Sequence, residues 1–493
     1  MGAGALIGLA FLVKMLQAFL VLPGFAVAYL ALAPTTLRAR ILDLLKAGAA
    51  MLVAAGWWVA IVSLWPASSR PYIGGSQHNS VLELVLGYNG LGRLTGNETG
   101  SVVGGGGKGG PGGNAMWGKT GWLRLFDASN GGQIAWLMPA ALIVLAGLLW
   151  VSRRMPRTDR KRAQLVLWGS WFLVTAAVFS QMQGIFHEYY SVVLAPPVAA
   201  IVGIGAAVLW RAREHLIARL LLAAAVVATA ITAYVLLNRS ASFHPWLRSS
   251  ILYGGLVAAA LILGAAWVAK AWQPAVAGVA LAATLAGPAA YTLDTVTTPH
   301  RGSIVTAGPA VAGARGGPGG GPRGARPPGF TGPGPGGQVF GGQLPGGQLP
   351  GGAIQGGPSF GAGGPGRGGQ GGLGGLLDAA TPDAALVSLL KTNASSYSWA
   401  AASVGANNAA GVQLATGLPV MAIGGFNGSD PAPTLAQFQA LVAAHKIHYF
   451  LGGGGFGGQQ GGSRSSSEIS SWVAANFTAN TVGGVTVYDL SVG

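Results

Sequence analysis

Long apolar stretches with almost no charge constrain this chain more than any other feature. A bilayer core about 30 Å thick needs roughly 20 apolar residues per helix, because unpaired backbone groups cannot be left in hydrocarbon. Eight stretches meet this need: residues 3–33, 47–65, 134–151, 164–180, 191–210, 220–237, 251–269 and 274–291. The first can also be read as two segments, broken near Lys14 or Pro23. The sequence therefore predicts a mainly α-helical, polytopic membrane bundle of about eight spans.

The composition supports this class and excludes others. The chain is 51% hydrophobic and 9% charged, whereas soluble domains average about 25% charged residues. The net charge of +16 comes from basic residues in short loops or Gly-rich tracts, and no Lys/Arg stripe interleaves with aromatic residues. A nucleic-acid partner is therefore not expected. The chain has no cysteine, so disulfides and Cys-ligated metals are excluded.

The distribution of Lys and Arg predicts the orientation, because short cationic loops stay on the cytoplasmic side. One set of loops holds Arg38, Arg40, Lys46, Arg153, Arg154, Arg157, Arg160, Lys161, Arg162, Arg211, Arg213, Arg219 and Lys270, whereas the alternate short loops hold Arg239 and Arg248. This pattern places residues 66–133, 181–190, 238–250 and everything after 292 outside. If the first stretch is a single span, Met1 lies outside too, which suggests further spans before it.

Composition divides the chain into three parts. Residues 1–295 form the transmembrane region, and Gly and Pro dominate residues 296–377, which reads as a disordered linker. Residues 378–493 alternate strand and helix signals and predict a small extracytoplasmic α/β domain with a parallel sheet. The expected strands are 397–404, 419–423, 447–451 and 485–490, and the expected helices are 382–391, 406–416, 434–445 and 467–476. This domain could bind a glycan or an acceptor, or serve as a spacer.

The densest polar stretch on the outer side is residues 65–99. In a functional reading, Arg93 or Arg70 neutralises a phosphate and Asn89 hydrogen-bonds a sugar hydroxyl. In the alternative reading this is a solvated loop capped by interfacial aromatic residues.

Two further features carry possible chemistry. His187 and Tyr190 lie in a short outer turn, where a protonated His could stabilise a phosphate leaving group; the alternative is an aromatic belt with an incidental His. Lys14 lies inside an apolar run, where a cation is a functional candidate by default unless it snorkels to the surface. The outer carboxylates and histidines show no ligand spacing, so neither a metal nor a cofactor is expected.

Four runs of sequence resemble a known family. These runs are Leu12-Val-Lys-Met-Leu-Gln-Ala-Phe-Leu-Val-Leu-Pro23, Trp65-Pro-Ala-Ser-Ser-Arg-Pro-Tyr-Ile-Gly-Gly-Ser-Gln77, Gly87-Tyr-Asn-Gly-Leu-Gly-Arg-Leu-Thr-Gly-Asn97 and Gln183-Gly-Ile-Phe-His-Glu-Tyr-Tyr190. They resemble the bacterial family 39 glycosyltransferases, relatives of protein O-mannosyltransferases and aminoarabinose transferases. The likeness is greatest to a mannosyltransferase subgroup of Gram-positive bacteria that carries a soluble C-terminal domain.

The resemblance implies a GT-C fold in the cell membrane. It also implies an enzyme that moves a mannose-like hexose, with inversion, from a polyprenyl-phosphate donor to an acceptor hydroxyl on a protein or a cell-envelope glycan. Lys14, Asn89, Arg93, His187 and Tyr190 match the family's substrate-binding elements. The family's acidic base follows the first span, and this chain has no carboxylate there; its nearest outer carboxylates are Glu83, Glu98 and Asp127. The catalytic base is therefore unassigned, and the sequence suggests that the N-terminal part of the enzyme is absent.

Two other functions stay open. The chain could be an inactive membrane anchor that presents its C-terminal domain as a binding module. A transporter is less consistent with the sequence, because repeated halves and charged or broken midplane helices would be expected and only Lys14 and a few prolines fit.

Overall fold

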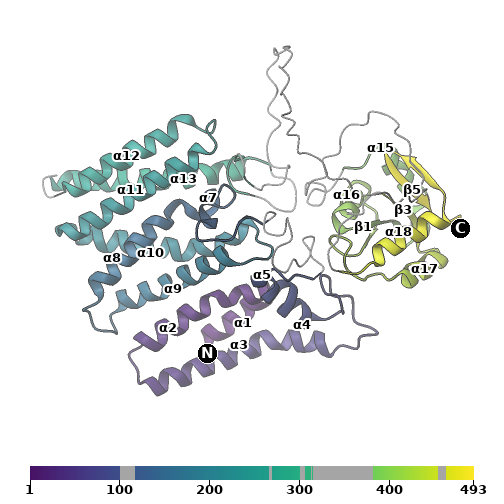
Figure 1. The fold of residues 1–493 in the computed structure, drawn as a ribbon, viewed down its shortest axis with the longest axis horizontal. Coiled ribbons are helices and arrows are strands. Elements are labelled where there is room, and N and C mark those ends of the chain that lie inside the picture. The colour runs from purple at the N-terminus through teal and green to yellow at the C-terminus, as the bar shows by residue number, and fades with distance from the viewer. Residues whose placement is uncertain are drawn as a thin grey trace, which may run out of the picture. The chain divides into compact units, whose positions relative to one another are not determined.

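The computed structural model of the 493-residue chain describes residues 1–99, 117–265, 269–299, 306–311, 314, 381–452 and 462–492. It confirms the expected fold class, a bundle of long apolar helices and a small α/β module (Figure 1). Eight helical segments of the described chain are long and apolar enough to cross a membrane: Gly2–Leu32, Leu37–Leu64, Gly131–Ser152, Arg160–Gln181, Glu188–Arg211, Leu216–Asn238, Pro245–Leu263 and Lys270–Thr297. All eight expected stretches are therefore present as helices.

The bundle is made of long helices joined to short 3-10 or π-helical pieces. The long helices are α1 (Gly2–Lys14), α2 (Leu22–Leu32), α3 (Leu37–Leu64), α8 (Met138–Ser152), α9 (Arg160–Gln181), α10 (Ala195–Arg211), α11 (Leu216–Asn238), α12 (Pro245–Leu263) and α13 (Gln273–Thr297). The short pieces are η1 (Met15–Val21), α4 (Val81–Glu83), η2 (Leu84–Leu91), α5 (Gly92–Thr95), η3 (Arg124–Phe126), α7 (Gly131–Ile134), η4 (Ala135–Leu137), η5 (Glu188–Leu194) and η6 (Lys270–Trp272).

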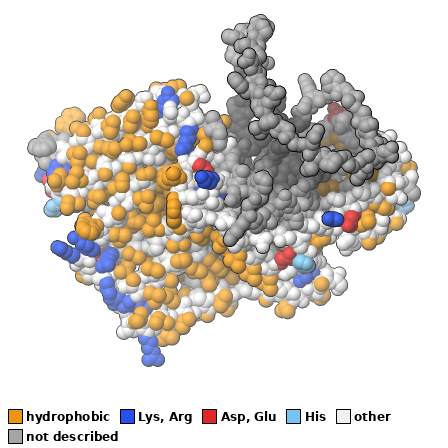
Figure 2. Space-filling model, viewed as in Figure 1, with side chains coloured by type: hydrophobic (Ala, Val, Ile, Leu, Met, Phe, Trp, Pro, Cys, Tyr) orange, Lys and Arg blue, Asp and Glu red, His pale blue; other side chains and the backbone are white. Residues whose placement is uncertain are grey.

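The two ends of the bundle differ in their connections. We call the end at which residues 65–130 connect α3 to α7 the loop end, and the opposite end, which carries the α2–α3 and α8–α9 connections, the basic end. In Figure 2, hydrophobic side chains cover much of the helical surface, and Lys and Arg gather along the edge at the basic end. A surface of this kind suits a helical bundle that is surrounded by lipid.

The first apolar segment is a hairpin. Gly4 of α1 lies against Ala47 of α3, and Gly8 lies against Met51 and Ala55, so α1 and α3 run in the same direction. Since the short turn at residues 33–36 makes α2 antiparallel to α3, both ends of the segment Gly2–Leu32 lie at the basic end. The chain therefore breaks at Lys14, one of the two expected places. The expectation that Met1 lies opposite the turn at residues 33–36 is wrong, because it assumed a single straight span.

Helix α3 begins ten residues before the expected start of its span, because its polar first turns have partners. Thr36 caps the helix by accepting a hydrogen bond from the Ala39 amide. The Arg40 guanidinium donates to the carbonyl oxygen of Leu30 at 2.6 Å. The hydroxyl of Tyr29 donates to Asp43 at 2.8 Å. These contacts hold the hairpin to α3 and let the helix extend beyond its apolar part.

The expected linker, residues 296–377, lies mostly outside the described residues. Its first two residues are the end of α13, and the described residues 306–311 contact the bundle. The amide of Ala307 donates to the side chain of Gln133 at 2.7 Å, and the Gln133 side chain donates back to the Ala307 carbonyl at 3.1 Å. The C-terminal boundary of the bundle therefore extends past residue 295.

The C-terminal module is a five-stranded sheet with helices on both faces. Its strands are β1 (Trp399–Val404), β2 (Val420–Ile423), β3 (Ile447–Leu451), β4 (Ala479–Val482) and β5 (Val485–Asp489), in the order β2-β1-β3-β5-β4. Its helices are α15 (Ala384–Lys391), η7 (Ala394–Ser396), α16 (Ala406–Thr416), α17 (Leu435–Ala443) and α18 (Ser465–Asn476). One core packs α17 and α18 against the sheet, and the other packs α15 and α16 against its opposite face.

The sheet is mixed, which corrects the expectation of a parallel sheet. β1 pairs with β2 and β3 in parallel, whereas β5 is antiparallel to both β3 and β4. The strand β4 was not expected, because its side chains are mostly exposed and its sequence lacks an apolar pattern. The local signal is Gly483-Gly484 between β4 and β5, both with positive φ, a pair typical of a two-residue hairpin turn.

Candidate functional site

The helix break in the first segment places Lys14 inside the loop end of the bundle. Lys14 is the last residue of α1, and the next residue, Met15, has a φ of 38°, which turns the chain out of the helix into η1. The Lys14 ammonium lies 4.2 Å from the ring centre of Tyr190 and 5.0 Å from that of Tyr189. Both distances permit cation–π contacts, which stabilise a cation that has left water.

The loop after α3 brings a second cation to the same place. A Cβ added at Gly90 would lie 2.2 Å from the Val85 carbonyl oxygen and 3.0 Å from a methyl group of Leu16. Glycine is therefore required by the tight turn of the η2 backbone, and the same position lies against the Leu16 side chain of η1. The neighbouring Asn89 and the following helix α5, which carries Arg93, are thereby held beside Lys14.

One cavity of about 350 Å³ joins these residues. Its polar lining includes Lys14, Gln17, Asn89, Arg93 and Tyr190, which come from five different elements. Its other side chains are apolar: Leu12, Val13, Met15, Leu16, Leu20, Leu94, Val178, Phe179 and Met182. Four of the five predicted site residues therefore line a single cavity with two cations and a mainly apolar wall.

The fifth predicted residue, His187, adjoins this cavity without lining it. Its ring stacks on Tyr189 at 5.4 Å between centres and meets the edges of Tyr190 at 5.3 Å and Trp117 at 5.1 Å. Burial, together with the charges of Arg93 and Lys14, lowers the pKa of His187 to about 4. The imidazole is therefore neutral at pH 7, which corrects the expectation of a protonated His. Its ring contacts are with Tyr189, Tyr190 and Trp117.

A buried carboxylate that was not predicted as a site residue holds this arrangement together. Glu98 is 2% exposed, and one of its oxygens lies 3.1 Å from the Arg93 guanidinium. Both of its oxygens accept the Ile185 N–H at 3.1 Å. Burial raises the pKa of Glu98, although Arg93 acts in the opposite direction. The sequence singled out Glu98 only as an outer carboxylate; its distance of 87 positions from Ile185 left no local signal.

Backbone contacts reinforce the same junction. The Gln183 amide donates to the Leu94 carbonyl at 3.1 Å, and the Gly184 amide donates to the Arg93 carbonyl at 3.0 Å. A Cβ at Gly184 would lie 2.6 Å from a Glu98 oxygen. The segment that precedes His187 is therefore joined directly to the one that carries Arg93.

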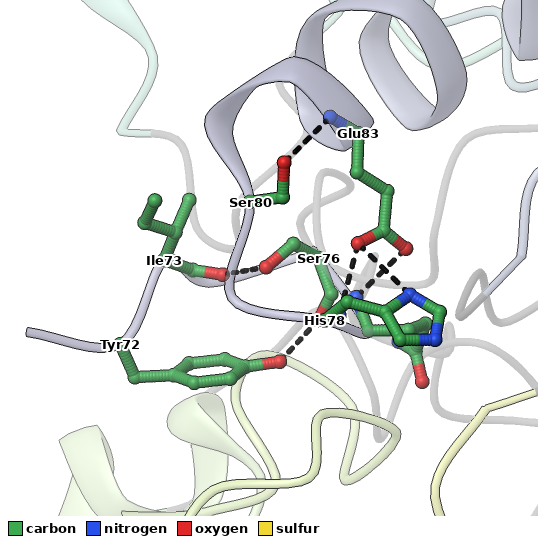
Figure 3. A network of polar contacts seen from close by, with 7 residues as sticks. Tyr72, Ile73, Ser76, His78, Ser80 and Glu83 are labelled. Carbon is green, nitrogen blue, oxygen red and sulfur yellow. Dashed lines mark hydrogen bonds and ion pairs between the residues drawn. The ribbon is translucent and has the colours of Figure 1, made fainter. Parts of the chain in front are cut away.

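The rest of the polar loop stabilises its own conformation. Glu83 accepts hydrogen bonds from the Gln77 and His78 amides at 3.0 and 2.9 Å and lies 3.3 Å from the His78 ring (Figure 3). Ser80 caps α4 by accepting from the Glu83 amide. Arg70, the other predicted phosphate ligand, donates to the Val62 carbonyl at 3.1 Å near the end of α3. Arg70 does not line the cavity, so Arg93 is the cation of this loop that does.

The electrostatics of the cavity favour a singly charged anion. Lys14 and Arg93 contribute two positive charges and Glu98 one negative charge, while His187 is neutral. Val13, part of the wall, is 87% exposed, so the rim of the cavity reaches the exposed surface of the bundle. An anionic head group on an apolar tail fits both the charge and the wall. Among the residues that the structure describes, no three His, Asp or Glu side chains gather as a metal site.

Comparisons with known proteins bear on both parts of the chain. Residues 386–476, in the C-terminal module, match the family model described as "Putative mannosyltransferase YkcB-like, C-terminal". The chain is 29% identical to "Putative mannosyltransferase YkcB" of Bacillus subtilis (strain 168), over 95% of this chain and 68% of that protein. It is 28% identical to "Putative mannosyltransferase YycA" of the same organism, over 96% of this chain and 70% of that protein. No solved structure matches.

These likenesses extend through the helical bundle as well as the module. The names of both relatives and of the family model agree on mannosyl transfer. The chain is thus a multi-pass membrane protein whose similarities support a glycosyltransferase, which implies a sugar donor and an acceptor.

Proposed function

We propose that this protein transfers a mannose-like hexose from a polyprenyl-phosphate donor to an acceptor hydroxyl, and that the cavity at the loop end binds the donor. The observation that carries this proposal is the pairing of Lys14 and Arg93 in a cavity with an otherwise mainly apolar wall. A donor of this class has one phosphodiester charge and a long isoprenoid chain. The two cations would bind the phosphate, and the wall and its rim at Val13 would accept the chain.

The reaction in this proposal is a displacement at the anomeric carbon of the sugar. The acceptor oxygen forms a bond to that carbon, the bond from the carbon to the phosphate oxygen breaks, and polyprenyl phosphate leaves with the electron pair. The acceptor proton passes to a base, which we leave unassigned. Lys14 and Arg93 would stabilise the charge that grows on the departing phosphate, and this stabilisation accelerates the chemical step.

The loop end would face the outside of the cell. The basic end holds thirteen of the Lys and Arg residues in the short connections, and such loops are retained in the cytoplasm. The C-terminal module follows α13, which ends at the loop end, so it would be extracytoplasmic. A protein or a cell-envelope glycan would be the acceptor, and the C-terminal module would bind it.

The test is transfer of labelled hexose from polyprenyl phosphate. Membranes with the wild-type chain are incubated with radiolabelled polyprenyl-phosphate mannose, and label in protein and glycan fractions is counted. Lys14→Met and Arg93→Met are each expected to lower the transfer rate at subsaturating donor by roughly 10- to 100-fold. This factor corresponds to the free energy that a hydrogen bond to a charged group usually contributes.

Arg248→Met is the matched control, since Arg248 is a cation at the loop end that bonds the Asn238 side chain outside the cavity. It should retain wild-type transfer. If the wild type binds the lipid, but neither it nor a version extended at its N-terminus transfers sugar from mannosyl, glucosyl or aminoarabinosyl donors, the enzyme proposal is refuted. An anchor that presents the C-terminal module is then the favoured function.

A further inference from the structure

Two large apolar side chains project from the loop end, and no neighbour within the described part of the chain buries them. Trp122 is 71% exposed and Leu123 is 77% exposed, although they are adjacent in a loop outside the membrane-spanning segments. Lys119, three residues earlier, is also exposed. Leaving two such side chains in water is unfavourable relative to burying them in an apolar environment.

The loop that carries these residues is firmly attached to α9. Arg124 is 3% exposed, and its guanidinium donates to the carbonyl oxygens of Met182 at 2.6 Å and Phe179 at 3.2 Å. The Gly121 amide donates to the Ser180 carbonyl at 2.8 Å. Trp122 and Leu123 lie between these two attachments. The depth of these two side chains in a bilayer is therefore determined by the position of the C-terminal end of α9.

The length of α9 indicates where this end lies in a bilayer. The helix has 22 residues and begins with Arg160, Lys161 and Arg162 at the basic end. At 1.5 Å per residue it is about 33 Å long, close to the thickness of a hydrocarbon core of about 30 Å. The carbonyl of Ser180 then lies near the far boundary of the hydrocarbon. Trp is enriched at this depth, and a nearby Lys can reach lipid phosphates.

We propose that Trp122 and Leu123 form a membrane anchor that inserts into the lipid leaflet at the loop end. The anchor holds residues 117–126 on the bilayer surface, beside the helix end whose Phe179 and Met182 line the cavity. Its partner is the interfacial region of phospholipid, between head groups and the first methylenes. The anchor is independent of the reaction proposed for the cavity.

The absence of cysteine makes a direct test possible, because a single introduced thiol can be labelled without background. Trp122→Cys and Leu123→Cys are labelled separately with an environment-sensitive fluorophore and reconstituted into phosphatidylglycerol and phosphatidylethanolamine vesicles. Part of the lipid carries a nitroxide near the head of the acyl chain. Both labels should lose most of their fluorescence, as a label at Leu173 within α9 also should.

Leu414→Cys is the matched control, since Leu414 is an equally apolar residue, 82% exposed, in α16 of the C-terminal module. Its label should be quenched little. The proposal would be overturned if the labels at residues 122 and 123 were quenched no more than the label at residue 414. It would also be overturned if these labels became shielded from water only after a protein or glycan acceptor was added. The Leu123 variant keeps Trp122 in place, so a folding defect in the Trp122 variant does not remove the test. The readout needs no transfer activity.

Discussion

Lys14 illustrates a conflict between stability and binding at a single residue. A cation near the membrane interior is expensive, and here two tyrosine rings compensate for only part of the lost hydration. The residue lies in a cavity where an anion would complete that compensation. A bound anion would offset this cost, in agreement with the proposed donor site.

The substitution Lys14→Met should therefore separate the two effects. It keeps an unbranched side chain one atom shorter and removes the charge, so we expect an unchanged or higher unfolding temperature together with donor binding weakened roughly 10- to 100-fold. Thermal unfolding in detergent and binding of polyprenyl-phosphate mannose measure these effects. Lys14→Arg, which keeps the charge, should retain more binding than Met. A drop in stability with unchanged binding would show that Lys14 is structural.

His187 should make the protein sensitive to acid. Its pKa in the folded chain is about 4, below the ordinary value of about 6.5 in an unfolded chain, so the unfolded state binds a proton first as the pH falls. The contribution of the neutral His187 to the free energy of unfolding is complete above pH 6.5. It decreases as the pH falls toward 4, by up to about 3 kcal/mol. His187→Gln should lose less stability between pH 7 and pH 4.5 in thermal unfolding.

His78→Gln is the control for this measurement, because the His78 ring is exposed. It should keep the acid sensitivity that is attributed to His187. Equal acid sensitivity in the wild type and in His187→Gln would contradict the assignment of a buried, neutral imidazole.

Glu98 should reduce the net positive charge at the cavity, because its carboxylate pairs with Arg93. The transfer reaction converts a phosphodiester into a phosphomonoester with more negative charge, and Glu98→Gln would leave Lys14 and Arg93 uncompensated. The Gln side chain can still accept from the Ile185 amide. We expect inhibition by polyprenyl phosphate to strengthen by about 1 kcal/mol, roughly fivefold.

Glu83→Gln is a suitable comparison for that experiment, since Glu83 belongs to the hydrogen-bond network of the neighbouring loop (Figure 3) and does not line the cavity. Its inhibition constant should equal that of the wild type. If both variants behave alike, Glu98 acts only in holding the loops together.

At the scale of the elements, small residues determine how closely the first helices approach. Gly4 and Gly8 are one helical turn apart on α1 and face the backbone of α3, an arrangement typical of membrane helix pairs. A Cβ at Gly8 would lie 2.4 Å from the Met51 carbonyl oxygen and 2.8 Å from the Ala54 side chain. The position of Lys14 depends on this contact, because Lys14 ends the same helix.

The substitution Gly8→Ala should therefore separate α1 from α3. Overpacking of this kind costs about 1–3 kcal/mol, so we expect a lower unfolding temperature and weaker donor binding. Gly56→Ala on α3 is the matched control, because a Cβ there meets nothing within 4 Å, and alanine favours helix by up to about 1 kcal/mol. A Gly8 variant as stable as the Gly56 variant would contradict the close packing of the hairpin.

At the scale of the whole molecule, the bundle and the C-terminal module each have their own hydrophobic core. Core residues of the module, such as Phe438, Ile469 and Val473, contact other residues of the module around its sheet. We expect a fragment of residues 381–493 to be soluble and to unfold cooperatively, as measured by circular dichroism and urea titration. A fragment that ends at residue 477 lacks β4 and β5 and leaves β3 without its antiparallel neighbour. It should aggregate or stay unfolded, and equal stability of the two fragments would contradict this role of β5.

The amino-acid sequence alone determined the class of this molecule. Three features carried this information: the eight apolar stretches, the difference between basic and polar loops, and the alternating helix and strand signals after residue 378. Each is local, because the length of a membrane span and the periodicity of a helix or strand are visible in consecutive residues. The candidate residues Lys14, Asn89, Arg93 and Tyr190 were predicted individually from the same local chemistry and from resemblance.

Only the tertiary structure decided how these residues meet. Gly90 against Leu16 and Glu98 against Ile185 join segments that are more than seventy positions apart, and no local pattern records such contacts. The turn at Met15 places both ends of the first segment at one side, and the burial of His187 makes its ring neutral. These outcomes depend on packing between distant segments, which is set by the shapes and charges of both partners together.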